Sequence, residues 1–206
     1  DGKTKGKINY TVWSDVFVCP DCMQEVIFWD VAVDKEAGVV KHEFPCPHCG
    51  AILNKRRMQR AWVNKYDSAI KETVRQAKQV PVLINYTVGK TRAEKKPDAS
   101  DLALIEKIEE SEIPYWFPTD RMPEGYNTAQ PKKSHGLTHV YHFYTKRNLW
   151  VLANIWFKIR RSDIPLRMAW IATGIDTICS KLLNFRISGS GKPTPLKGTL
   201  YISSLF

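Results

Sequence analysis

Residues 17–51 have the sequence "FVCPDCMQEVIFWDVAVDKEAGVVKHEFPCPHCGA", which contains two Cys-x-x-Cys pairs, Cys19/Cys22 and Cys46/Cys49. One such turn brings two sulfurs close enough to bind one ion. Two turns together supply the four thiolates of a closed, tetrahedral zinc site. We therefore predict that these four cysteines bind one zinc ion with a structural role. The fifth cysteine, Cys179, lies alone far downstream.

Between the two pairs, the sequence favours a β-hairpin. Residues 25–33 are apolar and rich in β-branched and aromatic side chains, residues 34–38 favour a turn, and residues 39–44 return as a strand. Two cysteine turns joined in this way are typical of a zinc ribbon. His48 lies inside the second turn, and we expect no metal contact from it because four sulfurs complete the ligand set.

Two other uses of the cysteines are less favoured. A disulfide within one Cys-x-x-Cys turn is strained, and nothing else in the chain is typical of a secreted, disulfide-linked protein. A redox Cys-x-x-Cys motif usually occurs once, in a thioredoxin-like βαβ setting. The paired spacing therefore favours zinc.

The composition indicates a folded protein with a polyanionic partner. Hydrophobic residues make up 43% of the 206 positions, which is enough for a real core. The net charge is +10, from 31 basic and 21 acidic residues, and this balance favours nucleic acid as the partner. No apolar run of about 18 residues and no signal peptide are visible, so we expect a cytoplasmic protein without a membrane partner.

The whole chain predicts an α+β fold, with a zinc ribbon inserted in or attached to a mixed α/β domain. We expect four segments, which are an N-terminal strand and zinc ribbon (1–53), helices and a β-hairpin (54–112), a Pro-rich loop and strand (113–144), and a helical segment with a terminal strand (145–206).

Local patterns assign the elements of the first two segments. They are a strand over 8–16, a helix over 54–66 capped by Asn54, a helix over 67–79 capped by Asp67 or Ser68, a hairpin over 80–97 with its turn near Gly89, and a helix over 98–111 capped by Ser100.

The last two segments are read in the same way. They contain an irregular loop over 113–136, a strand from His135 that would put His139 and His142 on opposite faces, a helix over 146–159 capped by Thr145, a helix over 162–185 with Pro165 near its start, a basic loop over 186–199 and a strand over 200–206.

No catalytic or cofactor-binding residue can be identified by spacing. The stretch GSGKPT (189–194) lacks the pattern of a phosphate-binding loop, because Arg186 and Pro193 occupy the positions that need Gly and Ser or Thr. The basic residues do form clusters beside aromatic ones. Each alone is best explained as a solvated side chain, but as a set they favour DNA contacts. The candidates are Arg56, Arg57, Arg60, Lys132, Lys133, Lys146, Arg147, Arg186 and Lys192.

Several phrases in order give the chain a family resemblance. They are "SDVFVCPDC" (14–22), "RQAKQVPVLINY" (75–86), "IPYWFPTD" (113–120) followed by "PEG" (123–125), "THVYHFYTKRNL" (138–149) and "KGTLYI" (197–202). In these phrases the chain resembles the large prokaryotic adenine-specific DNA methylases of the N4/N6 amino-methyltransferase superfamily that carry a zinc-ribbon insertion. The resemblance covers almost the whole chain.

The resemblance implies a role without catalysis. Such enzymes hold the flipped base with an Asp-Pro-Pro-Tyr motif and bind S-adenosylmethionine through a Phe-x-Gly-x-Gly loop. Neither motif occurs in residues 1–206. The chain begins at Asp1 and ends on an apolar run, so we expect the central, target-recognition segment of a longer site-specific methyltransferase that acts on adenine N6 or cytosine N4. Its partners would be double-stranded DNA and the rest of the parent enzyme, and only that parent would bind the methyl donor.

An alternative function belongs to a different class. A zinc ribbon can also be a stand-alone module that binds RNA or a protein partner, and a ribbon by itself does not separate the two.

Overall fold

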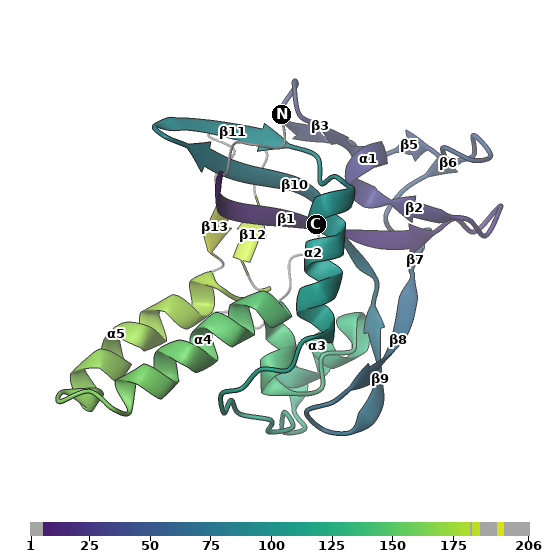
Figure 1. The fold of residues 1–206 in the computed structure, drawn as a ribbon. Helices are drawn as coiled ribbons and strands as arrows, with labels where there is room; N and C mark the ends of the chain where they lie inside the picture. The colour runs from purple at the N-terminus through teal and green to yellow at the C-terminus, as the bar shows by residue number, and fades with distance from the viewer. Residues whose placement is uncertain (1–5, 182, 186–192, 196–206) are drawn as a thin grey trace.

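The computed structural model describes residues 6–181, 183–185 and 193–195 of the chain. Helices and antiparallel strands are mixed, so the expected α+β class is confirmed. The main sheet has five strands in the order β11-β10-β1-β2, with β7 also pairing β1 (Figure 1). These strands are β1 (Lys7–Val18), β2 (Glu25–Ile27), β7 (Gln59–Arg60), β10 (Gln79–Val88) and β11 (Thr91–Lys95).

β1 is the central strand, and its two halves have different neighbours. From Lys7 to Asp15 it pairs with β10, whereas Phe17 lies between Val26 of β2 and Arg60 of β7. The sheet thus joins the expected segments 1–53 and 54–112. The second half of β1 is enclosed on both edges, and Phe17 is only 2% exposed.

Beyond β1 the chain surrounds the cysteines with short elements. These are α1 (Phe28–Ala32), β3 (Val33–Asp34), β4 (Val39–Val40), β5 (Phe44–Pro45) and β6 (Ile52–Leu53). The turn expected over 34–38 is confirmed, because β3 pairs with β4. The strand expected over 25–33 is wrong over 28–32, where α1 lies and buries Phe28, Trp29 and Ala32 together at helical spacing.

The two helices expected over 54–66 and 67–79 are absent, and strands take their place. β7 leads into β8 (Trp62–Asp67), which pairs with β9 (Glu72–Ala77) as a separate hairpin. The expected caps Asn54 and Asp67 do accept backbone N–H groups two or three residues ahead, but they close turns. Such a side-chain bond serves a turn as well as a helix start.

Three backbone hydrogen bonds fix the β8–β9 hairpin to the sheet. Val16 N donates to Lys78 O at 3.1 Å, Ala61 N donates to Val16 O at 2.8 Å, and Lys78 N donates to Ala61 O at 2.8 Å. These residues come from β1, from the link before β8 and from the link after β9. The hairpin therefore leaves the sheet at the point where the pairing partner of β1 changes from β10 to β7.

The hairpin expected over 80–97 is confirmed by β10 and β11, with Gly89 at φ +59° in its turn. A helix follows as expected, α2 (Ala99–Glu110), but its N-cap is Asp98 and not Ser100. The Asp98 carboxylate accepts the backbone N–H groups of Ser100 and Asp101, while Asp101 bonds back to the Asp98 N–H. Asp98 is therefore better placed, because the capping box needs the residue before the first turn.

The region 113–144 has more structure than expected. A helix, α3 (Tyr126–His135), lies within the expected loop and ends at Gly136, which adopts φ +69°. The strand expected from His135 is instead the end of α3 followed by a 3₁₀ helix, η1 (Val140–Phe143). His139 and His142 are consequently close, with ring centres 5.0 Å apart, and do not lie on opposite faces.

Two helices lie side by side after η1 (Figure 1). α4 (Lys146–Ile159) has Thr145 as its N-cap, as expected, and α5 (Pro165–Ile178) begins at Pro165 but is shorter than the expected 162–185. Within the described residues, no helix is long and apolar enough to span a membrane. β12 (Leu183–Phe185) pairs with β13 (Pro193–Pro195). Most of the loop expected over 186–199 and the strand over 200–206 lie outside the described residues.

Candidate functional site

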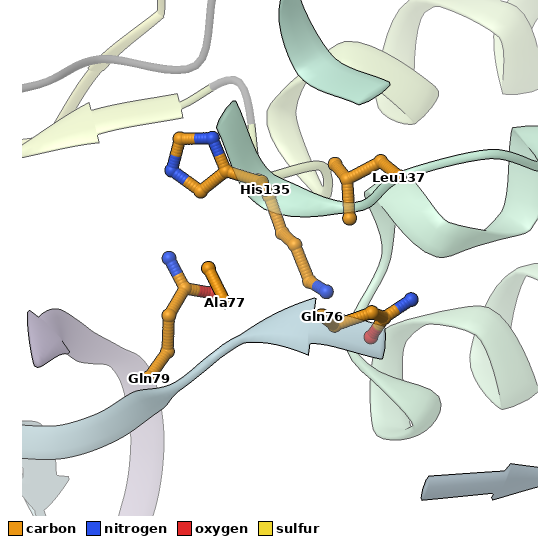
Figure 2. A pocket seen from close by; sticks show the side chains of 6 residues that line it. Gln76, Ala77, Gln79, His135 and Leu137 are labelled. Atoms are coloured by element: carbon orange, nitrogen blue, oxygen red, sulfur yellow. The ribbon is translucent and has the colours of Figure 1, made fainter. Parts of the chain in front are cut away.

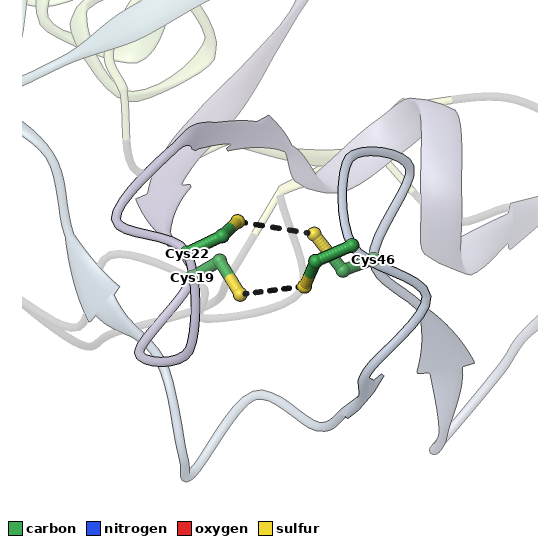
Figure 3. Close-up of side chains that lie close together, drawn as sticks. Cys19, Cys22 and Cys46 are labelled. Carbon is green, nitrogen blue, oxygen red and sulfur yellow. Dashed lines mark hydrogen bonds between the residues drawn. The ribbon is translucent and has the colours of Figure 1, made fainter.

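The four cysteines predicted as zinc ligands come together in space. Cys19 and Cys22 follow β1, and Cys46 and Cys49 lie between β5 and β6 (Figure 3). Their sulfurs all lie within 4.8 Å of one another, with 3.9 Å from Cys19 to Cys49 and 3.8 Å from Cys22 to Cys46. A tetrahedral zinc with Zn–S bonds of about 2.3 Å has S–S edges of about 3.8 Å. The cluster could therefore hold one zinc ion.

The two cysteine turns have the same backbone. Cys19 O accepts Met23 N at 2.9 Å, and Cys46 O accepts Gly50 N at 2.9 Å. The fifth residue of each turn is left-handed, with φ +60° at Met23 and +74° at Gly50. The two turns place their sulfur pairs facing each other (Figure 3). Glycine suits this position, while Met23 accepts a modest strain there.

The electrostatics of the cluster favour a bound cation. A backbone hydrogen bond from Gln24 lowers the pKa of the Cys22 thiol, but burial and the other three thiols raise the pKa to about 12. Burial raises the pKa of Cys46, but backbone N–H groups of His48 and Cys49 bring it down to about 6. The surroundings thus stabilise the thiolate of Cys46 and disfavour the thiolate of Cys22. Four thiolates can coexist only if a cation compensates their charge.

The surroundings of the cluster suit a structural ion. Cys19 and Cys46 are 0% and 3% exposed and belong to an apolar core. The other members of that core include Phe17, Val26, Phe28, Phe44 and Leu53. Four protein ligands leave no open position for a substrate. The ring of His48 lies with Nε2 3.1 Å from Glu25 O, which fits its expected exclusion from the ligand set.

The basic residues that follow the cysteines have different environments. Arg57 donates to Ile52 O at 2.7 Å, and Arg60 donates through Nε to the buried Asp15 carboxylate at 3.1 Å. Arg56 is exposed and its side chain has no hydrogen bond or ion pair with the described residues. Arg57 and Arg60 therefore hold the fold, while Arg56 remains available to a partner.

The remaining candidates lie in two other places. On α3, Lys132 donates to two backbone oxygens at 3.0 Å and pairs with Glu124 at 2.7 Å, whereas Lys133 is exposed. At the start of α4, Lys146 donates to Glu109 O at 2.7 Å and Arg147 is exposed. Neither Lys133 nor Arg147 has a side-chain partner among the described residues. Arg186 and Lys192 lie outside those residues.

A broad groove separates the sheet from α2 and the start of α4, with a volume of about 1320 Å³. Lys146 and Arg147 line it, but carboxylates outnumber basic groups in its wall. The acidic residues there are Asp67, Asp101, Glu106, Glu109, Glu110 and Glu112, and the basic ones are Lys65, Lys146, Arg147 and Lys181. This charge balance disfavours a polyanion inside the groove.

A buried polar cluster around Asp15 could not be recognised in the sequence. The Asp15 carboxylate accepts Arg60 Nε at 3.1 Å and Gln79 Nε2 at 2.8 Å, and His135 Nε2 lies 3.7 Å away. A cavity of about 10 Å³ adjoins it, with His135, Gln79 and Gln76 in its wall (Figure 2). That volume suits one water molecule, so the cavity is no substrate site.

A second cluster joins the β8–β9 hairpin to η1. Asp67 accepts the Tyr141 hydroxyl at 2.6 Å and lies 3.1 Å from His142 Nε2. Burial raises the pKa of Asp67, but the hydrogen bonds to His142 and Tyr141 lower it to about 2. The carboxylate is therefore ionised and fully engaged, which makes this group a structural clamp.

Comparisons with known proteins do not place the chain in a family. No family model matches it, and searches of curated proteins and of solved structures give no match. What supports a function is therefore the cysteine cluster, the net positive charge and the positions of the basic side chains.

Proposed function

We propose that the chain is the DNA-binding, target-recognition segment of a prokaryotic DNA methyltransferase that acts on adenine N6 or cytosine N4. Catalysis and S-adenosylmethionine binding belong to parts of the parent enzyme outside residues 1–206. The support is the ordered set of sequence phrases, the net charge of +10, and the lack of both the catalytic and the cofactor-binding motif within these residues.

The four cysteines belong to a zinc ribbon in this proposal, and zinc has a structural role there. The tetrahedral sulfur spacing and the buried position of Cys19 and Cys46 support it. The unfolded chain has no preformed metal site and binds the metal only weakly. Metal binding at such a site therefore contributes directly to the free energy of folding.

The main support for DNA binding is a set of exposed basic side chains that have no hydrogen-bond or ion-pair partner among the described residues. Arg56, Lys133 and Arg147 are exposed on three separate segments of the chain and engage no carboxylate among the described residues. Phosphate contacts by such side chains release counterions, and each neutralised phosphate adds about 0.9 to the slope of log affinity against log salt.

Fluorescence anisotropy of a labelled duplex at several salt concentrations tests this proposal. The triple variant Arg56→Ala, Lys133→Ala, Arg147→Ala should bind more weakly and lose up to about 2.7 from the salt slope. The control variant Lys35→Ala, Lys41→Ala removes cations that already lie near Glu94 and Asp34, and it should change the slope less. An unchanged slope in the triple variant would exclude these contacts, and no duplex binding by the wild type would refute the function.

A titration with S-adenosylmethionine tests the other half of the proposal. We expect no saturable binding by this chain, because the cofactor loop is missing from its sequence. Saturable micromolar binding in a calorimeter would contradict a segment without a cofactor site.

One observation favours the alternative, a zinc-ribbon module that binds another protein. α5 exposes large apolar side chains, with Leu166 86%, Trp170 83% and Ile171 62% exposed. A patch of this kind marks a protein contact, and the rest of the parent enzyme would also suit it. The anisotropy assay separates the two, since a stand-alone protein-binding module should show no salt-dependent binding to duplex DNA.

A further inference from the structure

The β8–β9 hairpin has two chemically different faces. Side chains alternate along each strand, and directly opposite residues share a face. The register pairs Asn64 with Arg75 and Tyr66 with Thr73, so these four residues lie on one face. All four are exposed, and Tyr66 is 67% exposed. This exposed face is called the ribbon face below.

The opposite face is attached to the rest of the protein. Val74 and Gln76 are buried there, 8% and 6% exposed, and Asp67 is bound by Tyr141 and His142 of η1. Both carboxylates of the two strands, Asp67 and Glu72, belong to this attached face. The ribbon face consequently carries no carboxylate from β8 or β9.

The positive charge on the ribbon face is available to a partner. Arg75 forms no ion pair with the described residues, and its guanidinium lies 5.0 Å from the centre of the Trp62 ring. Stacking on an aromatic ring orients a guanidinium while its in-plane N–H donors stay unused. Lys71 in the hairpin turn is also exposed and without a partner among those residues.

We propose that the ribbon face enters the major groove of DNA and that Asn64 and Arg75 contact base edges there. The inference rests on the DNA-binding function proposed above. The major groove is about 12 Å wide and admits a two-stranded β-ribbon, while Arg pairs with guanine and Asn with adenine through two hydrogen bonds each. Lys71 would contact a phosphate beside the groove.

The hairpin is held firmly enough for such recognition. Three backbone bonds among Val16, Ala61 and Lys78 fix its base, and the Asp67 clamp fixes the end near its turn. Along β9, Gly136 packs so closely on the backbone oxygen of Arg75 that a Cβ would overlap it. A ribbon fixed at three points loses little conformational freedom on binding.

Selection from random 20-base-pair duplexes tests the proposal. Wild-type protein should enrich a short sequence motif. Arg75→Ala should reduce the preference at one G·C position by about 5- to 150-fold, and Asn64→Ala should do so at one A·T position. The salt slope on a non-selected duplex should change by less than about 1 in either variant, because phosphate contacts remain.

Arg92→Ala is the matched control, because Arg92 is an exposed strand arginine on β11 of the main sheet. It should keep the wild-type motif and affinity. If Arg75→Ala and Asn64→Ala both keep the motif while duplex binding remains salt-dependent, the ribbon proposal is wrong and the DNA-binding function stands. Salt-dependent binding without any enriched motif would also overturn the ribbon proposal. If the wild type binds no duplex, or binds single-stranded RNA more tightly, both proposals fail.

Discussion

Asp15 is the carboxylate on which we expect the packing of α3 and β7 against the sheet to depend. Its side chain is 1% exposed, and it bonds to Arg60 of β7 and Gln79 of β10 and lies 3.7 Å from His135 of α3. Burial by itself raises the pKa of Asp15, but the nearby His135 ring, the hydrogen bond from Gln79 and the charge of Arg60 hold the pKa below its usual value. The group is therefore ionised at neutral pH.

The substitution Asp15→Asn keeps the shape of the side chain and removes its charge. Both carboxylate oxygens accept from donors, so the new amide keeps only one acceptor for Arg60 and Gln79. It also removes the negative charge that strengthens the hydrogen bond with Arg60, which is only 20% exposed. A hydrogen bond to a charged group contributes about 1.5–3 kcal/mol. We expect the variant to lose about 2–3 kcal/mol, which lowers the melting temperature by about 4–12 °C for a chain of this length.

The assay is thermal or urea unfolding of the zinc-loaded protein, with Asp21→Asn as the control. Asp21 lies 3.5 Å from Arg57, but both side chains are about half exposed (43% and 50%), so the loss should stay below about 1 kcal/mol. Because the pKa of Asp15 is lower in the folded than in the unfolded protein, its carboxylate stabilises the fold fully at any pH above the unfolded pKa. This stability is lost as pH falls through the folded pKa. The difference between wild type and Asp15→Asn should thus be constant from pH 8 to pH 6. Equal losses in the two variants would refute the role assigned to burial.

Three other substitutions have clear expected outcomes. Cys22→Ser should reduce bound zinc from one equivalent to below about half by mass spectrometry, while Cys179→Ser should keep it. Gly136→Ala should cost more than about 3 kcal/mol in urea unfolding, because its Cβ would overlap a backbone oxygen of β9, whereas Gly89→Ala, left-handed but with nothing within 4 Å, should cost about 1 kcal/mol. Lys55→Met should stabilise the protein at pH 7, because the amine is buried without a hydrogen-bond partner and burial lowers its pKa to about 8 from 10.5. Because the pKa of Lys55 is lower in the folded than in the unfolded protein, the wild type gains stability as pH rises from 8 toward 10.5. The stability advantage of Lys55→Met should therefore shrink over this pH range. A constant advantage would contradict burial of the charged amine as the cause.

Local signals were sufficient for several elements. The β10–β11 hairpin follows from its alternating strands and Gly89, and α4 follows from Thr145 and an apolar stripe. The four-cysteine cluster also depends mainly on local spacing, because each Cys-x-x-Cys turn brings its own two sulfurs together. In these cases the chain within about ten residues of a position contains the groups that decide its conformation.

Residues 54–79 show where local signals fail. Asn54 and Asp67 bond to backbone N–H groups just ahead of them, and that bond is common to helix starts and to turns. The choice between the two depends on partners elsewhere, since β7 completes the edge of β1 and β8 pairs with β9. The alternation of exposed and buried residues over 72–77 is visible only in the structure, because one of the two buried residues, Gln76, is polar.

The sequence by itself predicted the four cysteines that come together, the basic charge, and the helix and hairpin whose caps and turns lie within a few residues. Only the tertiary structure decided which basic residues remain free. Arg60 resembles Arg56 in the sequence, but Arg60 bonds to Asp15, 45 residues away, and cannot also serve a partner. The ribbon face is likewise a tertiary product, because α3 and η1 cover the other side of the same hairpin. The physical reason is that burial and ion pairing depend on neighbours in space, and a one-dimensional pattern does not contain them.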